Sequence, residues 1–273
     1  MIFVDGHVHI YDCFDVDLLF AAARDNFDRA AGQLGIGKES VTPVLLLTEG
    51  ATDNWYGRLL KTVKSTEQPV CKISADWDGR FSREMDWLMV YRRDNPEEKL
   101  YFVAGRQVVT AQSIEVLALF CSDTIQNGLS LKNTVAAIRQ SRAIPVLPWG
   151  VGKWLGKRGQ QIKEFLLSDG EGLLFLGDNG GRPKLWPTPT LFTQGLEKNI
   201  AVLPGTDPLP LPDEALRVGS FGFYLQEDGM QEASPVASLR HALCSGNAEI
   251  FSFGELLNNR VFLVNQLRLR FLS

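Results

Sequence analysis

The chain has 273 residues, of which 45% are hydrophobic and 22% are charged, and its formal net charge is −4. This length and composition fit a globular protein with a sizeable core. The acidic balance argues against nucleic-acid binding, which ordinarily needs a basic surface. No apolar run reaches the ~18 residues of a membrane span, so we expect neither nucleic acid nor a membrane as partner.

Cysteine usage and the first residues indicate where the protein resides. The four cysteines are far apart in the sequence and form no C-x-x-C motif (Cys13, Cys71, Cys121 and Cys244). This pattern is typical of reduced thiols in a cytosolic protein. The opening segment "MIFVDGHVHI" also lacks the basic start and apolar core of an export signal. We therefore expect a cytoplasmic protein.

The N-terminal segment predicts a strand–helix–strand unit. Residues 2–5 predict a short apolar strand that ends at Asp5 and Gly6. In "DVDLLFAAARDNFDRAAGQLG" apolar residues recur every three or four positions, which predicts an amphipathic helix capped by Asp15 and ended by Gly35. The short apolar run "TPVLLLTEG" predicts a buried strand. Such a unit implies a parallel sheet with a right-handed crossover.

The middle of the chain has a different pattern. Between residues 69 and 120, strand-like stretches such as "PVCKISA", "DWLMVYR", "KLYFVA" and "IEVLALF" follow one another with polar turns and no clear helix between them. This pattern predicts a meander of antiparallel strands. Helices and strands alternate again from "SLKNTVAAIRQSR" to "IAVLPGTDPLP", and the remaining tail is predicted to be mostly helical.

The order of predicted elements indicates the fold class. Alternating strands and helices with an antiparallel insertion favour the α/β class and a TIM-like barrel with an antiparallel β-hairpin section. No repeat, low-complexity tract or linker divides the sequence. We therefore expect residues 1–273 to form a single α/β barrel domain with a helical C-terminal tail.

Polar residues gather where the predicted strands end. In barrels of the TIM kind the active site lies at these carboxyl ends of the strands. The residues concerned are Asp5, His7, His9, Tyr11, Asp12, Thr48, Glu49, Asp53, Arg106, Gln107, Glu115, Trp149, Lys153, Asp178, Asn179, Arg182 and Asp207. Their positions predict an active site at one end of the barrel.

The His-x-His pair in the first predicted strand indicates a metal site. Alternate residues of a strand face the same side, so His7 and His9 should project together, ~6–7 Å apart along the strand. Imidazole nitrogens with one or two carboxylates suit zinc, iron or manganese. Asp207 is the best carboxylate candidate, because it follows an apolar strand in the turn "PGTDP". The alternative is that both histidines only form hydrogen bonds at a polar barrel mouth.

Several segments together resemble a known family. "DGHVHIYD" resembles the opening of the amidohydrolases and of the PHP (polymerase and histidinol phosphatase) metal-dependent phosphoesterases. "VAGRQVVTAQSIEVLALF", "AIPVLPWGVGKW" and "LPGTDPLP" resemble, in the same order, three later motifs of the PHP family. The resemblance spans about residues 3–212. It implies a distorted (β/α)7 barrel that hydrolyses phosphate esters on a cluster of two or three metal ions.

The departures from the family pattern are extensive. Other residues stand where the resemblance would place metal ligands, namely Gly50, Gln107, Glu115, Trp149, Gly150, Pro208 and Leu209. Only His7, His9 and Asp207 carry over. Three ligands suit one ion better than a cluster that clamps both sides of an in-line displacement. The sequence therefore predicts one divalent metal ion (Zn, Mn or Fe) at these three residues.

The remaining polar residues are assigned to catalysis. A small anionic molecule such as a phosphate ester would be held by Lys153 and Arg182. Glu49 or Asp178 would accept the proton of the attacking water, which a general base must reach directly. This hypothesis describes a divergent PHP-like metal-dependent hydrolase.

Two alternatives stay open. In one, catalysis has been lost, and the barrel binds a ligand or a partner protein, because most of the expected ligands are replaced. In the other, the protein is an amidohydrolase-type enzyme acting on C–N bonds. We rank the second alternative lower, because no histidine lies between His9 and His241, and that class usually has histidines after its middle strands.

Overall fold

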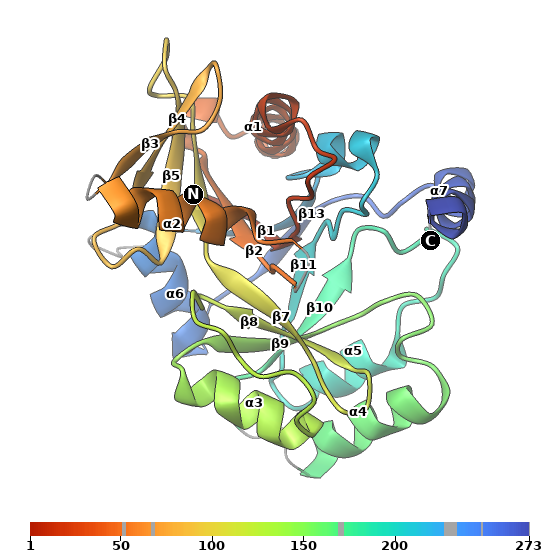
Figure 1. Cartoon of the computed structure of the whole chain (residues 1–273). Helices are drawn as coiled ribbons and strands as arrows, with labels where there is room; N and C mark the ends of the chain where they lie inside the picture. Colours follow the sequence, from red (N-terminus) through yellow and green to blue (C-terminus); the bar gives the residue numbers. More distant parts are fainter. Residues whose placement is uncertain (51–52, 67–68, 169–171, 227–233, 247, 273) are drawn as a thin grey trace.

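The computed structural model describes residues 1–50, 53–66, 69–168, 172–226, 234–246 and 248–272. Within these residues the strands fall into two mixed sheets with helices on their outer faces (Figure 1). The first sheet has the order β13-β12-β1-β2-β6-β5-β4-β3, and the second has the order β11-β10-β9-β8-β7. The fold is therefore of the α/β class, as predicted.

The strand bounds show where the predictions from the sequence hold. The first sheet contains β1 (Ile2–Val8), β2 (Thr42–Leu47), β3 (Val70–Lys72), β4 (Trp77–Phe81), β5 (Trp87–Arg92), β6 (Lys99–Val103), β12 (Phe221–Leu225) and β13 (Phe251–Gly254). The second contains β7 (Gly105–Val109), β8 (Glu115–Leu119), β9 (Ile144–Pro148), β10 (Phe175–Asn179) and β11 (Val202–Gly205). Strands β3 to β6 pair antiparallel, and so do β7 and β8, which confirms the predicted meander.

The meander is divided between the two sheets. β6 pairs with β2 in the first sheet, whereas β7 pairs with β8 in the second, and only Ala104 separates β6 from β7. An isolated bridge between Glu49 and Arg106 and close packing of β1 on β11 bring the two sheets together. The strands nevertheless remain in two sheets, so the predicted closed TIM-like barrel is not confirmed.

The helices cover the outer faces of the sheets. Their bounds are α1 (Val16–Gln33), α2 (Trp55–Thr66), α3 (Leu131–Gln140), α4 (Gly156–Ser168), α5 (Thr190–Leu196), α6 (Pro235–Ser245) and α7 (Asn259–Leu272), with 3-10 turns at Lys38–Ser40 and Pro212–Arg217 (η2). Figure 1 shows α3, α4 and α5 beneath the second sheet and α7 at the edge of the molecule. Every helix within the described residues is too short or too polar to cross a bilayer.

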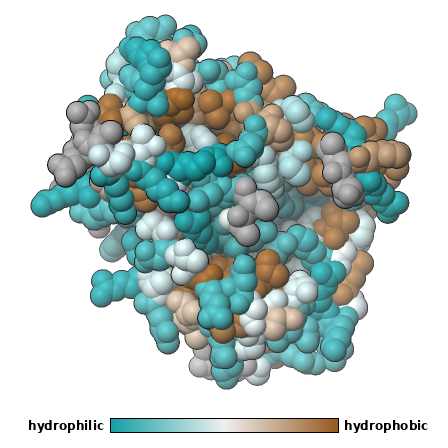
Figure 2. Space-filling model, viewed as in Figure 1, coloured by the Kyte–Doolittle hydropathy of each residue, from teal (hydrophilic) through white to brown (hydrophobic). Residues whose placement is uncertain are grey.

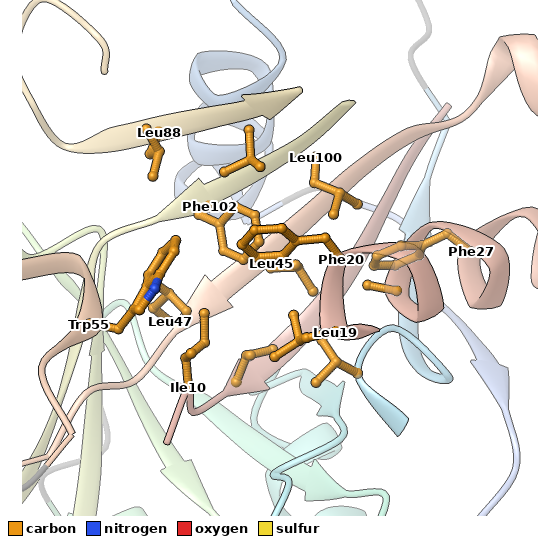
Figure 3. Packing of buried hydrophobic residues seen from close by; sticks show 14 of the residues in the cluster. Ile10, Leu19, Phe20, Phe27, Leu45, Leu47, Trp55, Leu88, Leu100 and Phe102 are labelled. Atoms are coloured by element: carbon orange, nitrogen blue, oxygen red, sulfur yellow. The ribbon is translucent and has the colours of Figure 1, made fainter. Parts of the chain in front are cut away.

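Helix α1 begins and packs as its sequence predicts. The Asp15 carboxylate caps the helix by accepting hydrogen bonds from the backbone N–H groups of Asp17 and Leu18. Just beyond the helix, Gly35 has φ +73°, a conformation that favours glycine. Phe20 and Phe27 lie with Leu45, Phe102 and other residues in the apolar cluster between α1 and the first sheet (Figure 3).

A second apolar cluster lies between the sheets. Ile2 and Val4 of β1 contact residues of the second sheet, such as Val146 and Leu203, in this cluster. Leu239 of α6 is part of the same cluster. The polar residues Asp5, His7 and His9, which come next in the chain, are buried as well. Their polar groups therefore need hydrogen-bond or charge partners inside the protein.

The C-terminal tail and the segment after β2 differ from the predictions. The tail contains strand β13 in addition to α6 and α7, so the prediction of a mostly helical tail is only partly correct. β13 forms by antiparallel pairing with β12, a long-range interaction that local periodicity does not reveal. Helix α2 was not predicted, and its buried residues Trp55 and Tyr56 anchor the segment that carries Asp53.

Candidate metal centre

Strand β1 brings two imidazoles together. Val8 belongs to the apolar cluster beneath α1, and its neighbours His7 and His9 face the opposite side, as alternation along a strand requires. Both histidines are buried, and their Nε2 atoms are 3.1 Å apart. The two rings therefore converge on one point, as the His-x-His spacing predicts.

Asp207 reaches the same point from the other sheet. It follows β11, and its backbone N–H donates to the carbonyl oxygen of His7 at 2.8 Å. Its Oδ1 lies 3.4 Å from the Nε2 of His7 and 3.6 Å from the Nε2 of His9. One ligand atom from each of the three residues lies within 4.8 Å of the others. The structure thus places the three predicted ligands together; that they hold an ion stays a prediction.

A buried carboxylate connects the strands that carry the three residues. Asp5 accepts hydrogen bonds from the N–H of Thr206 at 2.8 Å, from its hydroxyl at 2.6 Å and from the N–H of Gly219 at 2.9 Å. Burial outweighs these bonds and raises the pKa of Asp5 to about 6. Because Thr206 immediately precedes Asp207, Asp5 links β1 directly to the turn that carries the carboxylate ligand.

The electrostatics of the cluster suit a cation. Burial lowers the pKa of His7 to about 4, so its ring is neutral at physiological pH. Burial opposes the charge of His9 as well, but the Asp53 hydrogen bond and the Asp207 carboxylate outweigh it and raise its pKa. Burial also disfavours the charge of Asp207, yet the two histidines and Lys153 lower its pKa. Two nitrogens and one anionic oxygen form a donor set that Zn, Mn or Fe accepts.

Asp53 orients the ring of His9 by contacting Nδ1, the nitrogen that does not face His7. Its Oδ2 lies 2.7 Å from the Nδ1 of His9, and both side chains are buried. Asp53 is itself held by the N–H of Gly50, which donates to Oδ1 at 2.9 Å. A proton on Nδ1 of His9 leaves Nε2 with a free lone pair that points at His7 and Asp207. Asp53 was expected after the second strand, with no role predicted for it.

Replacing Asp53 by asparagine is expected to weaken metal binding by about 10- to 100-fold, the usual cost of losing an outer-shell partner of a metal-ligating histidine. Competition with a chromophoric chelator measures the affinity. The exposed Asp94, which pairs with Arg92 far from the histidines in the sequence, provides the control Asp94→Asn. Equal affinities for the two variants would contradict the role of Asp53.

Charged and amide side chains surround the cluster. Lys153 donates to both carboxylate oxygens of Glu115 at 2.5 and 2.6 Å, and the Lys153 side chain is 41% exposed. The charge of Lys153 lowers the pKa of His7 and of Asp207, and that of Glu115 raises the pKa of His9. The side chain of Gln107 opposes the lowering of the His7 pKa. These three residues therefore lie close to the cluster, and Lys153 does so as predicted.

The structure places Asp178 and Arg182 differently from their predicted roles. The Arg182 guanidinium donates to both carboxylate oxygens of Asp178, at 2.9 and 2.7 Å, and both side chains are largely buried. The neighbouring Asn179 instead donates to Oδ2 of Asp207. Because adjacent strand residues face opposite sides, Asn179 joins the cluster of His7, His9 and Asp207, while Asp178 and Arg182 satisfy each other away from it.

Glu49 lies beside the cluster but is not part of it. Its oxygens accept from the backbone N–H of Tyr56 at 2.5 Å and from Arg106 at 3.2 Å. It lines a pocket of about 250 Å³ together with Arg106 and Gln107. Burial raises the pKa of Glu49 to about 7, although Tyr56 and Arg106 oppose this shift. The predicted proton acceptors, Glu49 and Asp178, are thus both engaged by other groups.

The raised pKa of Glu49 has a consequence for stability. A carboxyl whose pKa is higher in the folded than in the unfolded state stabilises the fold below its unfolded pKa and loses that contribution as pH rises through its folded pKa. Replacing Glu49 by glutamine should therefore reduce the fall in the free energy of unfolding between about pH 5 and pH 8 by about 2 to 3 kcal/mol. Urea unfolding at several pH values measures this slope. The variant Glu97→Gln is the control, since Glu97 is exposed, and it should leave the slope unchanged.

Comparisons with known proteins show the fold alone. No protein-family model and no curated protein matches the chain. The crystal structure of PsfC from Pseudomonas syringae PB-5123 matches with a TM-score of 0.56 at 12% identity, over 99% of this chain and 98% of PsfC. The lesion-specific endonuclease PfuEndoQ from Pyrococcus furiosus gives a TM-score of 0.48 at 12% identity, over 91% of this chain and 57% of that chain.

A third structure, endonuclease Q in complex with a 27-mer duplex substrate, gives a TM-score of 0.46 at 11% identity. It covers 90% of this chain and 57% of that chain. The chain thus spans little more than half of the two endonuclease structures, and both TM-scores are below 0.5. The fold is therefore similar to that of PsfC along nearly its whole length.

Proposed function

We propose that the chain is a PHP-like metal-dependent hydrolase that holds one divalent ion at His7, His9 and Asp207 and cleaves a phosphate ester. The observation that carries the proposal is the meeting of these three donors, which come from two sheets and lie nearly 200 residues apart in the sequence. Each of the three positions matches the PHP motifs to which the sequence is similar. The shared donor point and the motif order support the same family.

A bound Zn, Mn or Fe ion would supply an activated water molecule and polarise the scissile bond. Neighbouring residues of the chain hold the proposed ligand side chains in position. Asp53 fixes the ring of His9 through the 2.7 Å bond to Nδ1, and Asn179 orients the carboxylate of Asp207 through its side-chain amide. Both contacts hold ligand atoms in place before a substrate arrives, which lowers the cost of positioning.

Lys153 and Glu115 are the groups that we assign to the substrate and to its proton. Lys153 is part-exposed and contributes positive charge to the cluster, so it can hold the anionic group of the substrate. Glu115 pairs with Lys153, and its carboxylate lies close enough to His9 to raise the pKa of that histidine. We assign it as the proton acceptor in place of Glu49 and Asp178, because its partner Lys153 is part-exposed and can turn to the substrate anion, whereas Glu49 and Asp178 are held by Arg106 and Arg182.

The second candidate is a barrel-like protein that has lost catalysis and binds a ligand. One feature favours it: neutral or non-ligating residues such as Gln107 and Trp149 stand where the PHP motifs carry further ligands. A neutral amide cannot balance two cations as a bridging carboxylate does. The two candidates share the metal site and differ in whether a reaction follows.

Metal analysis followed by an activity screen separates the candidates. Protein purified without added metal and without an imidazole column is analysed for transition metals, and we expect about one ion per chain. The same preparation is then tested on a panel of phosphomonoesters and phosphodiesters, before and after removal of metal by a chelator. Chelator-sensitive hydrolysis supports the proposed enzyme. Bound metal without hydrolysis supports the binding protein, and protein that takes up no metal overturns both.

A further inference from the structure

The C-terminal helix α7 makes polar contacts with the rest of the molecule. The side-chain amide of Asn265 donates to the buried carboxylate of Glu214 at 2.7 Å. Arg268 donates to both oxygens of Asp213, at 2.8 and 2.6 Å. Asp213 and Glu214 belong to η2. Phe262 and Leu269 of α7 are partly buried as well, so the inward side of the helix carries both polar and apolar residues.

The outer face of α7 carries several large apolar side chains that are exposed. The exposed fractions of its large side chains are 61% for Leu263, 53% for Val264, 54% for Leu267 and 88% for Phe271. Figure 2 shows hydrophobic residues gathered at the edge of the molecule where α7 lies. With Val261, these side chains present roughly 500 Å² of apolar surface, near the upper limit of the largest patch on a typical monomer. A patch of this size in a soluble fold indicates a binding surface.

We propose that α7 pairs with α7 of a second copy of this chain, antiparallel and about a two-fold axis. The centre of the exposed face is formed by Arg260, Val264, Leu267 and Phe271, spaced by four, three and four residues. Spacings of three and four produce the seam by which one helix packs on another. The order four–three–four is the same in both chain directions. Two copies of the helix can therefore lie antiparallel with the four residues of one opposite the four residues of the other.

The antiparallel arrangement gives each seam residue a suitable neighbour. Val264 of one copy meets Leu267 of the other, and Arg260 meets the ring of Phe271, where a cation over an aromatic face is favourable. These contacts occur twice, as an isologous interface requires. Two copies that cover the whole patch would bury roughly 1,000 Å² of apolar surface, the size at which biological interfaces begin.

A parallel pairing or a lipid surface fits the observations less well. In a parallel pair Arg260 would face Arg260 of the second copy, and like charges repel. A membrane needs an apolar face but no seam spacing. Moreover, Arg268 is bound to Asp213 within the molecule and is not directed to anionic headgroups. The second copy is therefore the occupant that explains both the spacing and the charges.

Analytical ultracentrifugation of the full chain tests the proposal. We expect the wild type to sediment as a dimer at micromolar concentration. Leu267→Glu should weaken dimerisation by about 100-fold or more, because each copy would then bury an unpaired carboxylate. The control is Leu167→Glu on α4, where an equally exposed leucine (60%) lies outside the proposed interface, and this variant should remain a dimer. Circular dichroism shows whether each variant is folded.

Charge pairing across the interface tests the antiparallel register. Val264→Lys alone should also produce a monomer. A mixture of the Val264→Lys and Leu267→Glu chains should form a heterodimer, because lysine of one copy then faces glutamate of the other. A monomeric wild type would overturn the proposal, whether or not it binds vesicles that contain phosphatidylglycerol. A Leu267→Glu chain that remains dimeric would also overturn it.

Discussion

The variant His7→Ala is expected to lose more than about 100-fold in affinity for a divalent metal, which exceeds the cost of losing an outer-shell partner. His7 supplies one of the three ligand atoms that lie within 4.8 Å of one another, and its removal leaves only His9 and Asp207. Because burial keeps the ring of His7 neutral, its lone pair is available without prior loss of a proton. Isothermal titration with Zn²⁺ or Mn²⁺ measures the loss.

The chain offers a matched control for this variant. His241 lies on α6 and is remote from the cluster in the sequence, so His241→Ala removes the same side chain elsewhere. Thermal unfolding with and without metal gives a second measurement that does not depend on the variant's own stability. A ligand that binds only the folded state stabilises it by about 2.7 kcal/mol at one hundred times its Kd. We expect this stabilisation for the wild type and His241→Ala, and its absence for His7→Ala. Equal stabilisation of all three proteins would show that His7 is not a ligand.

The convergence of the three ligand candidates could be predicted in part from local patterns. Two histidines separated by one residue share a face of any regular strand, so the pairing of His7 with His9 follows from their spacing alone. Asp207 was a candidate because it follows an apolar strand, but its approach to the histidines depends on the packing of β11 against β1 from the other sheet. The expected α/β class follows from the same alternation of strands and helices. These predictions need only the period of each element and the order of the elements.

The partners of these ligands depend on register and could not be predicted. Asp178 and Asn179 are adjacent on β10, and a shift of one residue decides which side chain faces the cluster. Asp178 was predicted as a proton acceptor, whereas the structure places Asn179 against Asp207. Asp53 reaches His9 because α2 anchors the segment around it, and α2 was not predicted although Trp55, Leu59 and Val63 recur at helical spacing. Outer-shell residues are thus set by tertiary packing rather than by local pattern.

The same distinction applies to the predicted barrel. The strands around Ala104 were found, but nothing in their composition indicates that β6 pairs with β2 while β7 pairs with β8. The choice of neighbour depends on contacts between distant segments, which the alternation of apolar residues leaves open. The structure therefore retains the predicted elements while it arranges the strands in two sheets.

The variant Gly205→Ala is expected to destabilise the protein by about 3 kcal/mol or more, because overpacking against backbone cannot relax by a side-chain rotation. Gly205 ends β11, immediately before the turn to Asp207. A Cβ atom there would lie 2.2 Å from the backbone nitrogen of His7 and 2.8 Å from the carbonyl carbon of Gly6. The substitution therefore forces β1 and β11 apart at the point where the two sheets approach. Urea unfolding gives the free energy of unfolding of the variant and of the wild type.

Gly32→Ala provides the matched control for this prediction. Gly32 lies in α1, where an added Cβ meets nothing within 4 Å, so alanine should stabilise the helix by about 0.5 to 1 kcal/mol. The Gly205→Ala variant has a second expected effect, since separation of β1 from β11 moves His7 away from Asp207. Its metal affinity should fall even under conditions where it remains folded, whereas Gly32→Ala should bind metal like the wild type. If Gly205→Ala unfolds at the same urea concentration as the wild type, β1 and β11 do not pack as closely as the structure has them, and the three ligand atoms lose the contact that brings them together.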